Sequence, residues 1–247
     1  MMQRFQNKVV CITGGSDGIG LATAKRFAAE GAHVYFTGRR QDRLDAAAAE
    51  IGHGAIGIQG DVGNGSDLDR LYERIGKDHG RVDVVFANAG ISESAALGQI
   101  DEAHIDRLFD TNIKGTVFTV QKALPLMGAG GSVILAGSGA GSKGFPALSM
   151  YSATKAAIRS LARTWTTDLK HKGIRVNVVS PGMIFTPAMH AYLDANPGME
   201  DGMKQMTPFG RLGEADEVAR AVLFLASEEG SFVAGDELFV DGGFVAV

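Results

Sequence analysis

Short apolar runs alternate with helical patterns along almost the whole sequence, and this alternation limits the possible fold more than any other feature. The runs are largely continuous in apolar residues, which is typical of strands that are covered on both faces. A parallel sheet with right-handed crossovers and helices on both faces buries such strands. We expect strands at residues 9–13, 33–37, 55–59, 82–86, 132–135, 174–179 and 237–240. The pattern therefore predicts an α/β fold with a doubly wound parallel sheet of about seven strands.

The helical patterns lie between these runs, and neither a linker nor a second domain interrupts them. We expect helices at about residues 18–30, 42–51, 67–77, 101–127, 151–171 and 214–226. The one long irregular stretch, residues 182–213, is rich in methionine and aromatic residues. Long loops of this kind are often lids. Residues 1–247 are thus expected to form a single domain with a substrate lid at about 183–213. The alternative is that this stretch is a surface loop whose methionines have no function.

Composition excludes several classes of protein. A net charge of −4 gives no basic footprint for nucleic acid. The single cysteine, Cys11, rules out a disulfide framework within the chain and fits a reducing compartment, so we expect a cytoplasmic protein. The first residues lack a signal-peptide pattern, and no apolar run is long enough to span a membrane. The six histidines form no spacing typical of a metal site, so we expect no metal.

A glycine-rich turn, residues 14–20, follows the first expected strand and opens the first helix. Strand, glycine-rich turn and helix N-terminus together are typical of a dinucleotide-binding site, where free N–H groups approach the pyrophosphate. The same residues match the nucleophile elbow of serine hydrolases, with Ser16 as the nucleophile. That elbow normally follows several strands, and it leaves Gly20 unexplained. We therefore favour the dinucleotide site and keep the hydrolase as an alternative.

The end of the second strand indicates which dinucleotide binds. A carboxylate at this position would bind the adenosine ribose of NAD, but the sequence has Arg39 and Arg40 instead. Arginine side chains suit a 2′-phosphate, which favours NADP(H) over NAD(H). Asp17, in the glycine-rich turn, argues against this because its charge would repel a nearby phosphate. The alternative is that both arginines are simply exposed and solvated.

Tyr151 and Lys155 are spaced four residues apart at the start of an expected helix, so their side chains share one face. An ammonium beside a phenol favours the phenolate and predicts a lowered pKa for Tyr151. Such a tyrosine can exchange a proton with an alcohol or a carbonyl near neutral pH. Ser138, at the end of an apolar run, is placed to bind the same substrate oxygen. The alternative is an ordinary amphipathic helix start.

With these residues in place, the chain resembles the short-chain dehydrogenase/reductase family, in its compact single-domain branch, over nearly its whole length. The motifs that carry the resemblance occur in the family's order: Thr13-Gly14-Gly15-Ser16-Asp17-Gly18-Ile19-Gly20, Gly60-Asp61-Val62, Asn88-Ala89-Gly90, Asn112, Ser138, Tyr151-x-x-x-Lys155 and Pro181-Gly182-x-Ile184-x-Thr186. The resemblance implies a Rossmann-type fold and an NAD(P)-dependent oxidoreductase that transfers a hydride between a nicotinamide and a ketone or secondary alcohol.

The resemblance also implies roles for individual residues. Tyr151 would be the general acid/base, Lys155 would lower its pKa and bond the nicotinamide ribose, Ser138 would polarise the substrate oxygen, and Asn112 would hold a water behind Lys155. The implied cofactor contacts are Gly14, Ser16, Asp17, Gly18, Ile19 and Gly20 in the glycine-rich turn, Arg39 and Arg40, Asp61 and Val62 at the adenine, Asn88, Ala89 and Gly90 along the ribose, Tyr151, Lys155, Pro181 and Gly182, and Ile184 and Thr186 at the nicotinamide amide or pyrophosphate.

The expected substrate is a small molecule with an apolar environment around its carbonyl. The candidate substrate-binding residues are Ser138, Ala140, Phe145, Tyr151, Met183 and Phe185. Such a pocket fits a ketone, a hydrophobic secondary alcohol or a 3-oxoacyl group. Family members are usually tetramers, so we expect a homotetramer, and the apolar residues 244–247 are candidates for its interface. A non-catalytic NADP(H)-sensing regulator is the alternative from another class, although the intact Tyr, Lys and Ser set argues against it.

Overall fold

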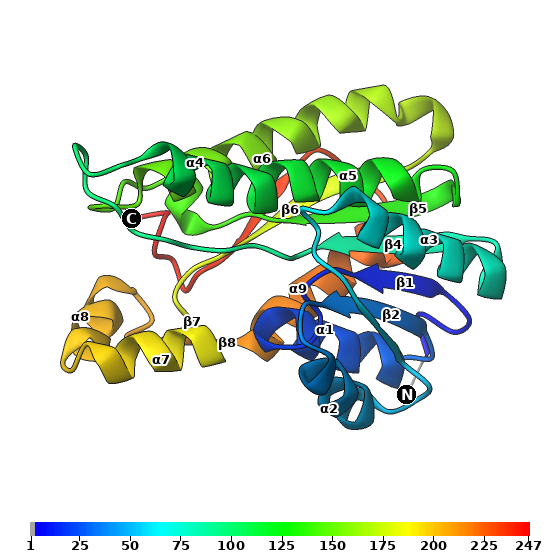
Figure 1. Ribbon diagram of the computed structural model, residues 1–247, viewed down its shortest axis with the longest axis horizontal. Helices are drawn as coiled ribbons and strands as arrows, with labels where there is room; N and C mark the ends of the chain where they lie inside the picture. The colour runs from blue at the N-terminus through cyan, green and yellow to red at the C-terminus, as the bar shows by residue number, and fades with distance from the viewer. Residues whose placement is uncertain (1–2) are drawn as a thin grey trace.

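The computed structural model describes residues 3–247, which contain one seven-stranded, fully parallel sheet (Figure 1). From one edge to the other the strands are β3 (Ile56–Gln59), β2 (His33–Gly38), β1 (Val9–Ile12), β4 (Val82–Ala87), β5 (Met127–Ala136), β6 (Arg175–Pro181) and β9 (Glu237–Val240). The strand order reverses at β1, which lies between β2 and β4. Open α/β sheets bind ligands beyond the carboxyl ends of the strands at such a reversal. The expected doubly wound fold is confirmed.

Helices cover both faces of the sheet (Figure 1). One face carries α1 (Gly18–Ala29), α2 (Gln41–Ile51) and α9 (Ala215–Ala226), and the other carries α3 (Gly65–His79), α5 (Gly115–Ala123) and α6 (Ser149–Asp168). Strand β1 explains the continuous apolar runs, because Val9 and Cys11 join the apolar cluster on one face, and Val10 and Ile12 join the cluster on the other. None of the helices in residues 3–247 has the length and apolar character needed to cross a membrane.

The helix expected over residues 101–127 is interrupted. It consists of α4 (Glu102–Phe109), a single π-helical turn (Asp110–Lys114) and α5, and β5 already begins at Met127. In the π-turn the N–H of Gly115 donates to the carbonyl of Asp110, five residues back. The turn therefore inserts one residue into the helical repeat and leaves Asn112 at its centre, buried. Turns of this type occur often at functional sites.

Residues 182–213 are also more regular than expected. They contain β7 (Ile184–Phe185), α7 (Pro187–Ala195), α8 (Met199–Met206) and the first residue of β8 (Gly213–Glu214), which pairs with β7. Helix α7 begins where the hydroxyl of Thr186 accepts a hydrogen bond from the N–H of Met189 at 3.2 Å, with Pro187 in the first turn. Threonine followed by proline is a recognisable helix start. The prediction of an irregular stretch is therefore wrong, because Thr186 and Pro187 start a helix.

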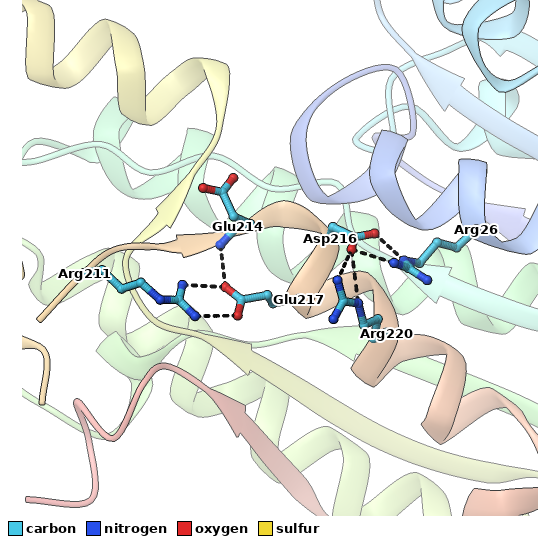
Figure 2. A network of polar contacts seen from close by, with 6 residues as sticks. All are labelled: Arg26, Arg211, Glu214, Asp216, Glu217 and Arg220. Carbon is cyan, nitrogen blue, oxygen red and sulfur yellow. Dashed lines mark hydrogen bonds and ion pairs between the residues drawn. The ribbon is translucent and has the colours of Figure 1, made fainter. Parts of the chain in front are cut away.

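A network of ion pairs joins α1 to the start of α9 (Figure 2). The carboxylate of Asp216 accepts hydrogen bonds from Arg26 Nη2 at 2.5 Å and from Arg220 Nη2 at 2.6 Å. The neighbouring Glu217 accepts two hydrogen bonds from the guanidinium of Arg211 and one from the N–H of Glu214. Bonding to Arg26 lowers the pKa of Asp216 to about 2, and bonding to Arg211 lowers the pKa of Glu217 to about 2.

We expect Asp216→Asn to weaken the protein at neutral pH and to have less effect in acid. A carboxyl whose pKa is lowered by folding stabilises the protein above its unfolded pKa, near 4. That contribution disappears as the pH falls toward 2. Urea unfolding from pH 7 to pH 2.5 should show the free energies of unfolding of variant and wild type converging in acid. Glu200→Gln, which breaks an exposed pair with Lys204 on α8, is the control and should change little at any pH. A gap for Asp216→Asn that is constant with pH would contradict this role.

Candidate active site

Three of the expected catalytic side chains meet at the carboxyl end of β5. Ser138 follows this strand, and its hydroxyl accepts a hydrogen bond from the N–H of Ala140 at 3.2 Å. Tyr151 lies in the first turn of α6, as the spacing predicts, and Lys155 lies one turn later. The ammonium of Lys155 donates to the carbonyl oxygen of Ala136 at 2.8 Å and lies 5.7 Å from the centre of the Tyr151 ring. The three side chains thus lie together beyond the carboxyl end of β5.

The pKa values differ from the expectation at Tyr151. Burial raises the pKa of this phenol, while hydrogen bonding with the Ser138 hydroxyl acts in the opposite direction. Burial also lowers the pKa of Lys155 to about 8. The predicted lowering of the Tyr151 pKa by Lys155 is therefore not found, because the ammonium bonds the Ala136 carbonyl rather than the phenol oxygen. Desolvation acts on both groups in the direction that disfavours charge.

Asn112 links the π-turn to the catalytic helix. Its side-chain amide donates to the carbonyl of Ile91 at 2.9 Å and to the hydroxyl of Thr154 at 3.1 Å, and its carbonyl accepts from the N–H of Ile91 at 2.9 Å. Thr154 in turn donates to the backbone carbonyl of Tyr151 at 2.7 Å. Asn112 therefore fixes the start of α6 and the strand-end segment beside Gly90. No motif in the sequence pointed to Thr154 as part of this link.

The glycine-rich turn is held in a shape that only glycine permits at two positions. A Cβ atom on Gly20 would lie 2.1 Å from the carbonyl oxygen of Gly14, and Gly14 itself has a φ of +65°. Asn88, after β4, closes the turn by donating from its amide to the carbonyls of Thr13 and Gly14, both at 3.0 Å. Helix geometry leaves the first N–H groups of α1, including that of Ile19, without intrahelical partners. This cradle fits the pyrophosphate of a dinucleotide.

Other expected cofactor residues lie around the same cradle. A Cβ on Gly18 would lie 3.2 Å from Cγ2 of Thr186, so the start of α7 adjoins the turn. The side chain of Asp61 accepts from the N–H of Gly63 at 2.9 Å, and Val62 is buried beside Gly115. Ala89 donates its N–H to the Thr13 hydroxyl at 3.2 Å, and a Cβ on Gly90 would lie 3.5 Å from Lys155 Nζ. Pro181 ends β6, and the N–H of Gly182 donates to Val240 at 3.0 Å.

The two arginines after β2 are exposed and adjoin the turn. A Cβ on Gly38 would lie 2.7 Å from Oγ of Ser16, which places this serine at the end of β2 beside Arg39 and Arg40. In the described part of the chain neither guanidinium forms an ion pair, and Arg39 is bound only through its carbonyl, which accepts from Gln59 at 3.0 Å. Asp17 accepts the N–H of Gly18 at 2.8 Å as the cap of α1.

The expected substrate residues lie in the loops that follow β5 and β6. Ala140 is buried two residues after Ser138, and Met183 and Ile184 line a cavity of about 270 Å³ together with Thr207 and Phe209. Phe185 stacks on His190 with ring centres 5.1 Å apart, and Phe145 stacks on Phe244 at 5.5 Å. Phe244 was expected at an interface between copies, yet it is buried within its own chain. The sequence marked residues 244–247 as apolar but gave no sign of this partner.

Comparison with known proteins shows that the chain is similar to oxidoreductases over its whole length. Residues 14–245 match the family model described as Enoyl-(Acyl carrier protein) reductase. The chain is 47% identical to Oxidoreductase asL5 of Sarocladium schorii, over 100% of this chain and 99% of the relative. It is 36% identical to the NADP-dependent (R)-specific alcohol dehydrogenase of Lentilactobacillus kefiri, over 100% of both chains. A solved structure described as a short chain dehydrogenase/reductase family protein has 41% identity and a TM-score of 0.87, over 99% of this chain and 100% of the other.

Proposed function

Because this chain belongs to the short-chain dehydrogenase/reductase family and is an NAD(P)-dependent oxidoreductase, we propose that it interconverts a ketone and a secondary alcohol, or reduces a 3-oxoacyl group. The observation that carries the proposal is the meeting of Ser138, Tyr151 and Lys155 at the carboxyl end of β5, beside the glycine-rich cradle. The hydrolase alternative for Ser16 loses its support, because the relatives are oxidoreductases and Ser16 lies at the cofactor cradle.

The proposed roles follow from what each side chain can reach. When bound, the nicotinamide supplies or accepts the hydride. Tyr151 gives a proton to the substrate oxygen in reduction and takes it back in oxidation. Ser138 donates a hydrogen bond to the same oxygen, and Lys155 supplies positive charge beside the phenol and binds the ribose. Asn112 holds the start of α6 against the Ile91 backbone. A water bound by Asn112 behind Lys155 would relay protons between Lys155 and solvent.

A paired screen tests the substrate class. Absorbance of the reduced nicotinamide should fall when the protein is mixed with NADPH and an apolar ketone or a 3-oxoacyl thioester. It should rise with NADP and the matching secondary alcohol. A panel in which no carbonyl compound or secondary alcohol changes the absorbance, although the protein binds NADPH, would refute the proposed reaction.

We propose NADP(H) as the preferred cofactor, supported by the exposed guanidinium groups of Arg39 and Arg40 and by the NADP-dependent relative. Replacing either arginine with alanine should raise the KM for NADPH by about 10- to 100-fold, since a hydrogen bond to a charged group contributes about 1.5–3 kcal/mol. The KM for NADH should change little. Arg43→Ala, an exposed arginine on α2, is the matched control and should alter neither value. Equal losses with both dinucleotides would argue against a 2′-phosphate contact.

Residues 183–213 are proposed as the substrate lid of the single domain. Support comes from the two short helices α7 and α8, which expose Tyr192, Met199 and Met206. The residues on either side of these helices, Met183 and Thr207 among them, line the cavity. We also propose a homotetramer, on the family's usual assembly and on the fully exposed Phe232 after α9. Sedimentation of the purified protein tests the assembly, and a monomer at micromolar concentration would refute it.

A further inference from the structure

The last residues of the sequence, which we call the 241–247 segment, fold over the loop that follows β5. Phe244 is 3% exposed and stacks on Phe145 with an interplanar angle of 19°. A Cβ on Gly139 would lie 3.0 Å from Cγ2 of Val245. Because Gly139 directly follows Ser138, the segment lies against the peptide next to the hydroxyl that is proposed to bind the substrate. Figure 1 places the end of the chain on the same side of the molecule as α7 and α8.

Two side chains anchor the 241–247 segment. Within it, the carboxylate of Asp241 accepts hydrogen bonds from the N–H of Gly243 at 2.9 Å and of Val245 at 2.8 Å. From the loop after β5, the ammonium of Lys143 donates to the carbonyl of Phe244 at 2.9 Å and of Val247 at 3.3 Å. The same ammonium lies 4.5 Å from the centre of the Phe244 ring, a cation–π distance. Lys143 is therefore the tie between the segment and the loop.

The opposite side of the segment faces the base of the proposed lid. A Cβ on Gly242 would lie 2.8 Å from Thr207 Cγ2, and one on Gly243 would lie 3.2 Å from Pro208 Cγ. Beside this contact is the cavity of about 270 Å³, lined in part by Asp241 and Phe209. The segment thus packs against Gly139 on one side, and on the other it contacts the lid base at the edge of an open cavity. If the Lys143 tie is removed, the segment has room to move away from Ser138.

We propose that the 241–247 segment is a wall of the substrate pocket, and that Lys143 is the positioning residue that holds it there and limits substrate size. The inference rests on the proposed function, since it assigns the space beside Ser138 to the substituents of the carbonyl carbon. With the tie in place, the wall favours a compact substituent. Without it, a larger flat substituent fits beside Ser138 while the cofactor cradle, formed by other residues, is unchanged.

The test uses Lys143→Met, which keeps the length and the apolar stem but removes the donors. The probes are acetophenone and 2-acetonaphthone, two methyl ketones that differ by one fused ring. The kcat/KM ratio of the larger ketone over the smaller should rise about tenfold, within the range by which pocket shape discriminates substrates. The KM for NADPH should not change. Lys143→Arg, which keeps a cationic donor, should return the ratio toward wild type, and Lys170→Met, an exposed lysine elsewhere, should leave it unaltered.

Hydrogen exchange provides a readout that does not require turnover. The amide of Val245, bonded to Asp241, should exchange faster in Lys143→Met than in wild type. Equal exchange rates would overturn the role of Lys143 as the tie. If Lys143→Met is active and its kcat/KM ratio for the two ketones equals that of wild type, the inference is overturned while the proposed function stands. A wild type that binds NADPH but turns over no carbonyl in the panel would instead overturn the proposed function, and the assignment of this wall to a substrate with it.

Discussion

Replacing Tyr151 with phenylalanine is expected to lower kcat by about 100- to 10,000-fold, the usual contribution of a general acid or base. The substitution keeps the half-buried ring and the contact with Lys155, and it removes only the hydroxyl that exchanges the proton. Affinity for NADPH should stay within about fivefold of wild type, because a typical neutral hydrogen bond contributes about 1 kcal/mol.

Steady-state turnover of the best ketone, with fluorescence titration of NADPH, measures both quantities. Tyr35→Phe is the matched control, since its hydroxyl on β2 donates to Asp78 of α3 at 2.7 Å and not to the site, and its kcat should equal that of wild type. A kcat for Tyr151→Phe within tenfold of wild type would show that the proton comes from another group.

The second large effect is expected at Gly20, where alanine should weaken NADPH binding by about 100-fold. The added Cβ would lie 2.1 Å from the Gly14 carbonyl oxygen and 2.7 Å from the Asn88 amide, so the turn must open. Opening it moves N–H groups away from the phosphates, and each charge-assisted bond lost costs about 1.5–3 kcal/mol. Overpacking should also lower the free energy of unfolding by about 1–3 kcal/mol.

Gly76→Ala separates this effect from the general effect of replacing a helical glycine. Gly76 lies inside α3, where an added Cβ would make only an ordinary contact with Leu126 at 3.6 Å. That variant should bind NADPH as wild type does and gain about 0.5–1 kcal/mol of stability. Isothermal titration and urea unfolding of both variants provide the comparison. Wild-type affinity in Gly20→Ala would mean that the cradle does not hold the dinucleotide.

Patterns within the chain were sufficient to predict the architecture. Strand β1 is apolar on both faces because Val9 and Cys11 meet one layer of helices, and Val10 and Ile12 meet the other. The glycine at position 20 and the spacing of Tyr151 and Lys155 each follow from local geometry, and these are what sequence patterns express best. The fold class and the grouping of the Tyr, Lys and Ser residues could therefore be anticipated.

Features that depend on long-range contacts could not be anticipated. The π-turn around Asn112 is stabilised by the Ile91 backbone and Thr154, which are 21 and 42 residues away. The pKa of Tyr151 is set by burial, and a spacing of four residues contains no information about desolvation. The contact of Lys143 with Phe244 joins residues 101 positions apart. Each of these requires the folded chain.

The pairing of α1 with α9 has a consequence for how the protein is made. Arg26 and Asp216, which join these helices, are 190 residues apart, and the apolar face of α1 packs in the same cluster as Val218 and Val222 of α9. Synthesis proceeds at about 5–20 residues per second. Helix α1, which ends at Ala29, is therefore synthesised roughly ten seconds or more before α9, which begins at Ala215. During that interval the side of α1 that packs on α9 has no native cover, so this pairing forms only when synthesis is nearly finished.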